Sequence, residues 1–147
     1  KTSKRLAEGQ RRDLSELAKI GISLTEVIYI NDLKSGSPFA YAALIGGVLG
    51  NASESELRIL DSFGRDLGVA YQIKDDIVDF SGKEEEIGKP TGQDERKITV
   101  VDLVGLSGAH DLVASYERSA KNHLNQLRQD SRDVSLLESL VDVILKV

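Results

Sequence analysis

The order of apolar and polar residues along the chain predicts helices throughout. Residues 4–20 place four side chains at i, i+4, i+7 and i+11, the spacing of one helical face: Leu6, Gln10, Asp13 and Leu17. Two of the four are polar, which distinguishes this face from an ordinary apolar stripe. No stretch of useful length alternates apolar and polar residues as a half-buried strand does. The chain is therefore predicted to be all-α.

Three capping boxes predict where helices begin. In each, a Ser stands three residues before a Glu, so that the two side chains satisfy free backbone N–H groups at the helix start. The pairs are Ser23 with Glu26, Ser53 with Glu56, and Ser135 with Glu138. The first of these helices is expected to end near residues 34–36, and the second to run to about residue 80. Pro38 suits the first turn of a further helix over residues 39–49.

Two features of these helices bear on packing. Gly64 and Gly68 lie four residues apart on the long helix, and each costs about 1 kcal/mol relative to Ala, so we expect another helix to approach closely there. The apolar run at residues 39–50 is too short for a membrane span, which takes about 20 apolar residues, and is predicted to be a buried helix. Residues 81–97 form a loop by composition, and helices are expected over residues 111–127 and from the third capping box.

Composition narrows the class of protein. The 147 residues suffice for one domain, and 24 acidic against 19 basic residues, without a basic stripe, argue against a nucleic-acid partner. The chain has no Cys, which excludes disulfides, zinc-thiolate sites and thiol catalysis. No signal peptide is visible, so a cytoplasmic location is expected. Because the chain starts at Lys1 and contains no Met, we expect a processed form or a fragment of a longer product.

Three carboxylates crowd one helical turn at Asp75, Asp76 and Asp79. Like charges at this spacing cost about 0.2–0.5 kcal/mol per pair, and carboxylates at a helix C-terminus cost about 0.3–1 kcal/mol each, so a positive partner is expected. Asp75 and Asp79 share a face, which suits Mg²⁺ or, similarly, Mn²⁺. Lysines of the following loop, such as Lys89 and Lys97, would reach phosphate oxygens. The pattern predicts a magnesium-bridged phosphate site.

A simpler interpretation stays open from the residues alone. Acidic strings are common on solvated helix ends, Gln10 and Asp13 are surface residues if their helix is rotated, and Lys34 complements a helix dipole. On this alternative the chain is a helical interaction domain.

Five motifs in matching order resemble the trans-isoprenyl diphosphate synthase family, which includes the farnesyl and geranylgeranyl diphosphate synthases. They are Gly9-Gln10-Arg11-Arg12-Asp13, Lys34-Ser35-Gly36, the string from Tyr71 to Asp79, Gly88-Lys89-Pro90-Thr91-Gly92-Gln93-Asp94, and Lys97-Ile98-Thr99. Ser35 stands where the family has Thr, and Lys97 follows Asp94 more closely than usual. The resemblance implies an isoprenoid synthase-type helical bundle around a central cavity.

The implied reaction is the magnesium-dependent, head-to-tail condensation of an allylic prenyl diphosphate with isopentenyl diphosphate, releasing diphosphate. The resemblance assigns roles as follows: Asp75, Asp76, Asp79 and Asp13 at the metal, Lys34 and Lys89 on the allylic diphosphate, Gln72 orienting the metal shell, Gln10 and Ser35 lining the cavity, and Asp94 and Lys97 in a closing loop. Of these, Lys34, Gln72, Asp75 and Lys89 would be catalytic.

Family features are also missing from the sequence, namely a first aspartate-rich motif with paired arginines and an earlier Gly-Lys segment that binds isopentenyl diphosphate. Residues 1–147 are therefore expected to be the C-terminal portion of a single all-α prenyltransferase domain, inactive alone and part of a homodimer. The alternative is a non-catalytic, regulatory subunit of a heteromeric prenyltransferase.

Overall fold

The computed structural model describes residues 2–15, 21–86 and 98–146, with the backbone alone for residues 13–15 and 82–86. It is all-α, as predicted, and the described residues contain no strand. The elements in chain order are α1 (Thr2–Ser15), α2 (Leu24–Asn31), the π-helical turn η1 (Asp32–Gly36), α3 (Ser37–Leu49), α4 (Glu54–Glu86), α5 (Val100–Gln129) and α6 (Ser135–Leu145). Within these ranges, no helix is both long and apolar enough to cross a membrane.

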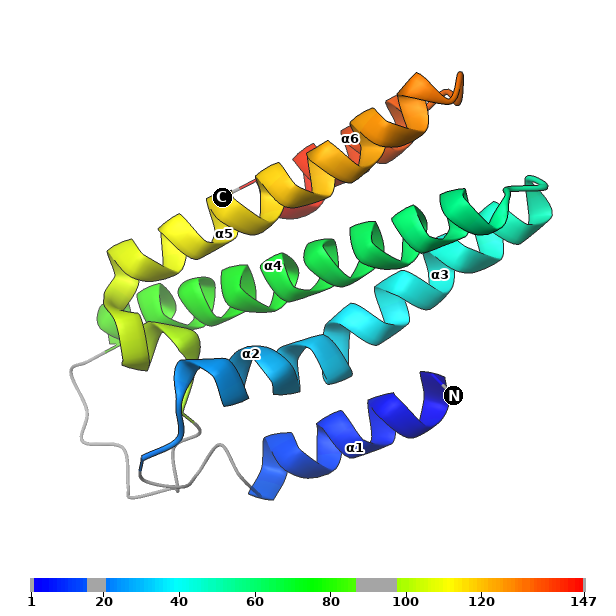
Figure 1. The fold of residues 1–147 in the computed structure, drawn as a ribbon. Coiled ribbons are helices and arrows are strands. Elements are labelled where there is room, and N and C mark those ends of the chain that lie inside the picture. Colours follow the sequence, from blue (N-terminus) through cyan, green and yellow to red (C-terminus); the bar gives the residue numbers. More distant parts are fainter. Residues whose placement is uncertain (1, 16–20, 87–97, 147) are drawn as a thin grey trace.

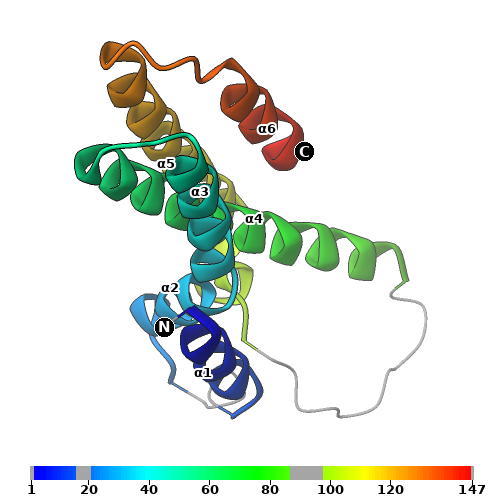
Figure 2. The same cartoon turned by 90° about the vertical axis from the view of Figure 1, so that its right-hand side faces the viewer.

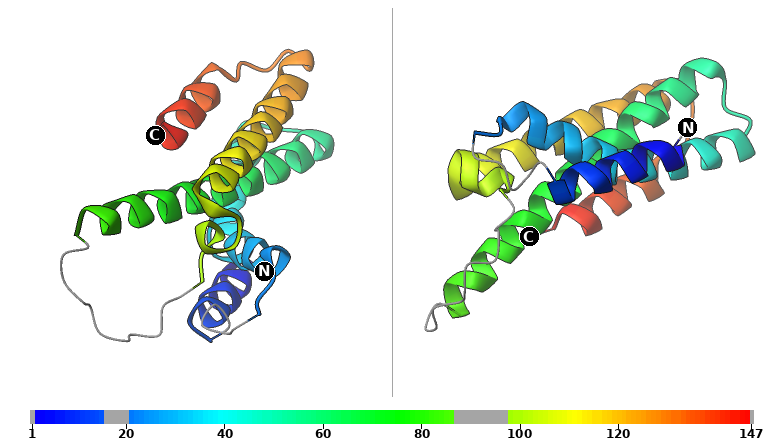
Figure 3. Two further views of the ribbon diagram at one scale, coloured as in Figure 1. Left: turned by 90° about the vertical axis from the view of Figure 1, so that its left-hand side faces the viewer. Right: turned by 90° about the horizontal axis from the view of Figure 1, so that it is seen from below.

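The long helix α4 is the central element of the fold. The segment α2–η1–α3 runs antiparallel to it on one side, and α5 runs antiparallel to it on the other (Figure 1). Helix α6 folds back along α5, and α1 lies beside α2 and the start of α3 (Figures 1 and 3). The C-terminal part of α4 projects beyond the other helices (Figure 2).

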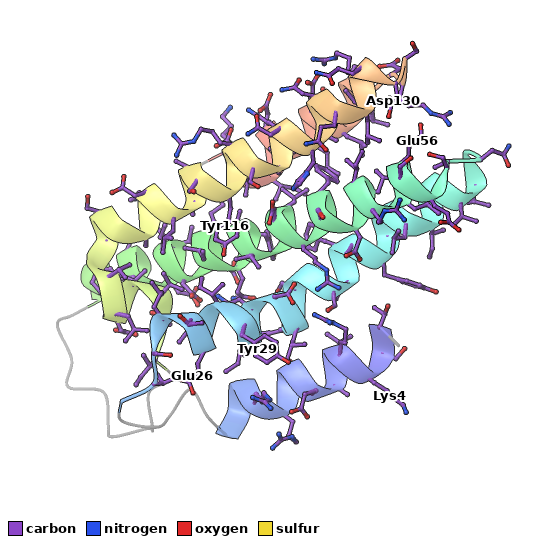
Figure 4. All side chains as sticks on the ribbon, viewed as in Figure 1. Lys4, Glu26, Tyr29, Glu56, Tyr116 and Asp130 are labelled. Carbon is purple, nitrogen blue, oxygen red and sulfur yellow. The ribbon has the colours of Figure 1, made fainter. Side chains whose placement is uncertain are left out.

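The core has two apolar clusters along α4. One joins α2, the C-terminal half of α4 and the start of α5: Val27, Ile30, Val69, Ile73, Ile77, Val100, Val101, Ala109 and Val113. The other joins the N-terminal half of α4 to α5 and α6: Leu60, Phe63, Leu67, Ala70, Ala120, Leu124, Leu127, Val134, Val141 and Leu145. Tyr116, which extends from α5 toward α4 (Figure 4), packs against both clusters.

The prediction that the helix beginning after Ser23 ends near residues 34–36 is wrong. Helical structure continues without interruption from α2 through η1 into α3. Pro38 explains why the continuity takes a π-helical form. Its ring lacks an N–H and clashes with the carbonyl of residue i−4 in a regular α-helix. In η1 the Ser37 N–H instead reaches back five residues to the Asp32 carbonyl, and this wider turn accommodates the proline.

Several other predicted boundaries also change. The capping boxes at Ser23 and Ser53 are confirmed. The box at Ser135 is wrong, because Val134 is the N-cap residue and Glu138 pairs with Arg128 at 2.5 Å. The backbone of α4 continues to Glu86 rather than ending near residue 80, and residues 16–20 of the first expected helix lie outside the described residues.

The prediction that residues 39–50 form a buried helix is only half right. One face of α3 packs on α4, but Tyr41, Val48 and Leu49 on the other side are 52%, 61% and 79% exposed. A helix that is apolar on every side is expected to be buried all round. Within this chain α3 therefore presents an uncovered apolar face.

Candidate functional site

The Lys34-Ser35-Gly36 motif lies in η1, which packs closely against α1 and α4 at two glycines. A Cβ at Gly9 of α1 would lie 2.7 Å from the backbone nitrogen of Lys34. A Cβ at Gly68 of α4 would lie 2.6 Å from the carbonyl oxygen of Ser35. Both distances are far below ordinary contact, so only glycine permits this approach, and the close packing predicted for Gly64 and Gly68 is confirmed.

A buried hydrogen bond connects η1 to the aspartate-bearing part of α4. The Ser35 hydroxyl donates to Oε1 of Gln72 at 3.0 Å. Ser35 and Gln72 are 9% and 7% exposed, so the bond is shielded from water. Two motifs separated by 37 residues thereby meet in space.

The three aspartates of α4 divide into two groups. Asp75 and Asp79 are exposed and, being four residues apart, share one face. Asp76 is 9% exposed and turned inward, where the Gln72 amide and the Val100 N–H approach its two oxygens at 3.4 and 3.5 Å. Because Val100 is the first residue of α5, the carboxylate also meets the positive end of that helix dipole. Asp76 thus links the motif to the fold, and Asp75 and Asp79 face outward.

The cation within the acidic string has a different partner. Lys74 donates from Nζ to the carbonyl oxygen of Ile144 at 2.8 Å. That carbonyl belongs to the last turn of α6, where backbone oxygens lack a partner within the helix and the dipole favours a cation. Lys74 therefore fastens α6 to α4.

The remaining predicted site residues are placed only in part. Lys34 is half-buried in η1, and Gln10 is exposed on α1, one position from the buried Gly9. The backbone of Asp13 lies in α1, but its side chain, like Lys89, Asp94 and Lys97, lies outside the described residues. Among the side chains that are described, no three of His, Asp and Glu come close enough together to hold a metal ion.

Sequence reasoning overlooked two polar residues at the junction of α2 and η1. Asn31 is 2% exposed, and its Nδ2 finds no hydrogen-bond partner among the described residues. Asp32 accepts hydrogen bonds from Arg5 of α1 and Arg65 of α4. The only sequence signal was the presence of two polar residues shortly before the Lys34 motif, separated from it by Leu33, in a helix otherwise rich in apolar residues.

An apolar pocket of about 690 Å³ opens between α3, α4 and α6. It includes Phe39, Gly64 and Leu67, with the Glu56–Arg132 ion pair at one end. The Phe39 ring stacks at a tilt on Tyr71, with centroids 5.6 Å apart, one helical turn before Asp75. The pocket and the outward aspartates therefore follow each other along α4.

Known proteins resemble this chain in sequence and fold. The profile of the polyprenyl synthetase family matches residues 1–144. The farnesyl diphosphate synthase of Geobacillus stearothermophilus is 36% identical over 138 residues, which are 92% of this chain and 46% of that enzyme. The heterodimeric geranylgeranyl pyrophosphate synthase large subunit 2 of Arabidopsis thaliana is 31% identical over 125 residues, 81% of this chain and 33% of that protein. A Helicobacter pylori geranyltransferase crystallised with magnesium and isoprenyl diphosphate superposes with a TM-score of 0.71 at 26% identity, over 95% of this chain and 45% of that one.

The chain spans less than half the length of each of these three proteins. The family profile nevertheless covers nearly all of it, and the expected isoprenoid synthase-type helical fold is confirmed. The chain belongs to the polyprenyl synthetase family.

Proposed function

We propose that this chain supplies the site for the allylic diphosphate in an isoprenyl diphosphate synthase. The full-length protein would join that substrate head to tail to isopentenyl diphosphate and release diphosphate. Family membership and the similarity to a farnesyl diphosphate synthase support this proposal. The observation that carries it is the Ser35–Gln72 hydrogen bond of 3.0 Å, because it joins the turn bearing Lys34 to the helix bearing Asp75 and Asp79.

The outward carboxylates fit a magnesium ion shared with substrate. Mg²⁺ in phosphate sites takes one or two protein carboxylates and fills its other positions with water and phosphate oxygens, and Mn²⁺ accepts the same ligands. Asp75 and Asp79 offer such oxygens, and the described part of the chain gathers no larger ligand set. When bound, the metal neutralises charge on the departing diphosphate.

The chain's own residues bind and orient the substrate. Lys34 provides a positive charge for the diphosphate from η1. Gln72, fixed by Ser35, orients Asp76 and the neighbouring carboxylates from within α4. Further positive charge would come from Lys89 and Lys97. These roles, with those of Gln10, Asp13 and Asp94, stay predictions.

We further propose that residues 1–147 form the C-terminal portion of one prenyltransferase domain. The greater length of the relatives and the uncovered apolar face of α3 support this. The isolated chain is then expected to be inactive, and a first aspartate-rich motif is expected upstream in the full-length protein. Homodimer formation and a cytoplasmic location also stay predictions.

The decisive experiment measures binding of a non-reactive allylic analogue, farnesyl thiodiphosphate, to the full-length protein by calorimetry with and without Mg²⁺. We expect Mg²⁺-dependent binding that weakens at least about tenfold in Asp75→Asn. Asp111→Asn, which removes an exposed helical carboxylate from α5, serves as the matched control and should bind normally. Binding that ignores Mg²⁺, or that survives Asp75→Asn unchanged, would contradict the proposal.

A second candidate function is that of a subunit in a heteromeric prenyltransferase. It is favoured by the similarity to a protein named as the large subunit of a heterodimeric geranylgeranyl pyrophosphate synthase. On this alternative, condensation activity appears only after mixing with a second, different chain. Activity of the purified full-length protein alone would exclude it.

A further inference from the structure

We propose that Asp32 is a positioning residue that holds η1 in the π-helical form that presents Lys34 to the substrate and Ser35 to Gln72. The inference rests on the function proposed above, which places Lys34 at the allylic diphosphate. Asp32 acts through the backbone of η1 and is not required to touch substrate.

Two arginines from different helices donate hydrogen bonds to the carboxylate oxygens of Asp32. Arg5 of α1 donates from Nη2 to Oδ2 at 2.7 Å. Arg65 of α4 donates from Nη1 to Oδ1 at 2.8 Å and to Oδ2 at 3.0 Å. The Asp32 side chain is 21% exposed, so these charge-assisted bonds are partly shielded from solvent. The carboxylate thereby fixes the start of η1 to the two helices that flank it.

Arg5 also fixes the other end of the turn. Its Nε donates to the Ser37 hydroxyl at 2.9 Å, while the Ser37 N–H makes the π-helical bond to the Asp32 carbonyl. One guanidinium therefore spans the first residue of η1 and the residue that follows its last. A register change to a regular α-helix would move Ser37 relative to Asp32 and break this arrangement.

Gly36, the last residue of the Lys34-Ser35-Gly36 motif, leaves room for the carboxylate. A Cβ at this position would lie 2.6 Å from Oδ1 of Asp32 and 3.3 Å from the carbonyl oxygen of Arg65. Its φ of −56° is an ordinary helical value, so the glycine is needed for space and not for backbone freedom. The motif glycine and Asp32 thus form one packed unit.

The hydrogen bonds around Asp32 are better explained by a role in positioning η1 than by a contribution to the folding free energy. Ion pairs at partly exposed positions add little to the folding free energy, whereas π-helical turns are uncommon and occur often at functional sites. Here the charges converge on the π-helical turn η1, and that turn carries Lys34, the lysine proposed to bind the substrate. Misplacing such a group by a fraction of its contact distance weakens binding and catalysis strongly.

The test compares Asp32→Asn with Asp61→Asn in the full-length protein. Asp61 is the other partner of Arg65, at 2.8 Å from its Nε, but it lies on α4 outside η1. Both variants remove one carboxylate from the same arginine. We expect Asp32→Asn to raise the KM for the allylic diphosphate, and the Kd for farnesyl thiodiphosphate with Mg²⁺, about tenfold, with the KM for isopentenyl diphosphate unchanged. Asp61→Asn should alter none of the three, although it too removes an ion pair of Arg65 and should lower the unfolding midpoint.

A second pair of variants keeps the test independent of folding losses. Gly36→Ala should raise the allylic KM in the wild-type background, and by much less in an Asp32→Ala background, because the obstructed carboxylate is then gone. Equal allylic KM values for Asp32→Asn, Asp61→Asn and wild type, or an undiminished Gly36→Ala effect in Asp32→Ala, would overturn the positioning role alone. A wild-type protein that binds no analogue with Mg²⁺ would instead overturn the proposed function on which the role rests.

Discussion

Replacing Gly68 by Ala tests the close contact between α4 and η1. The added Cβ would lie 2.6 Å from the Ser35 carbonyl oxygen, 2.7 Å from Gly36 Cα and 2.8 Å from Gly36 N. Ordinary contact begins at 3.4 Å, so the deficit is 3.4 − 2.6 = 0.8 Å. All three atoms belong to the backbone, so no side chain can rotate away, and η1 and α4 must separate.

The magnitude follows from two opposing effects. Overpacking of this kind costs typically about 1–3 kcal/mol, and replacing a helical Gly by Ala returns about 1 kcal/mol of propensity. Because all three obstructing atoms are backbone, the overpacking cost falls in the upper part of that range, about 2–3 kcal/mol, and we expect the free energy of unfolding to fall by about 1–2 kcal/mol. The separation should also lengthen the Ser35–Gln72 hydrogen bond and lower kcat.

Urea unfolding of the full-length protein measures this change, and Gly46→Ala is the matched control. Gly46 also lies inside a helix, α3, but among the described residues no atom beyond its own stretch of helix backbone lies within 4 Å of its Cβ position. The same substitution there should raise the free energy of unfolding by roughly 0.5–1 kcal/mol. If Gly68→Ala is as stable as wild type, or if both variants shift in the same direction, the close-contact argument is refuted.

Three further predictions use individual contacts. Ser35→Ala leaves the buried Oε1 of Gln72 without its donor and should lower the free energy of unfolding by about 1–3 kcal/mol in urea, whereas Ser35→Thr, which retains the hydroxyl, should lose much less. Lys74→Met removes the cation from the last turn of α6 and should lower the free energy of unfolding by about 1 kcal/mol in thermal unfolding. Binding of the allylic analogue with Mg²⁺ should persist. Loss of that binding would show that Lys74 acts at the aspartates of α4 and not at α6. Arg132, with the Ser53 backbone and hydroxyl, lowers the pKa of Glu56 from 4.5 to about 2, so this carboxylate stabilises the fold above pH 4.5 and the contribution is lost as the pH falls toward 2. As the pH is lowered from 4.5 toward 2, the thermal unfolding midpoint of wild type should therefore fall by more than that of Glu56→Gln. Midpoints that fall in parallel for the two proteins would contradict the lowered pKa of Glu56.

Local hydrogen-bond patterns made part of the fold readable from sequence. The boxes at Ser23 and Ser53 form as predicted because both partners lie within one turn. The box at Ser135 fails for a related reason. The Ser135 N–H donates to Asp133 at 3.0 Å, and Arg128 donates to the Glu138 carboxylate. Because both groups have other partners nearby, Ser135 and Glu138 do not form the expected pair. The family motifs were likewise readable, since residue type and order alone identify them.

The tertiary structure decided how those motifs are presented. Pro38 favours the π-helical turn locally, but the contacts that surround the turn come from distant residues. Asp32 pairs with Arg5 and Arg65, which are 27 and 33 residues away, and glycines of two other helices allow η1 to approach them. The division of the aspartates likewise depends on the start of α5, 24 residues beyond Asp76. Helix periodicity and capping are settled within a few residues by backbone geometry. The direction in which a polar side chain points is settled by the charges and volumes that packing brings beside it, and these come from distant parts of the chain.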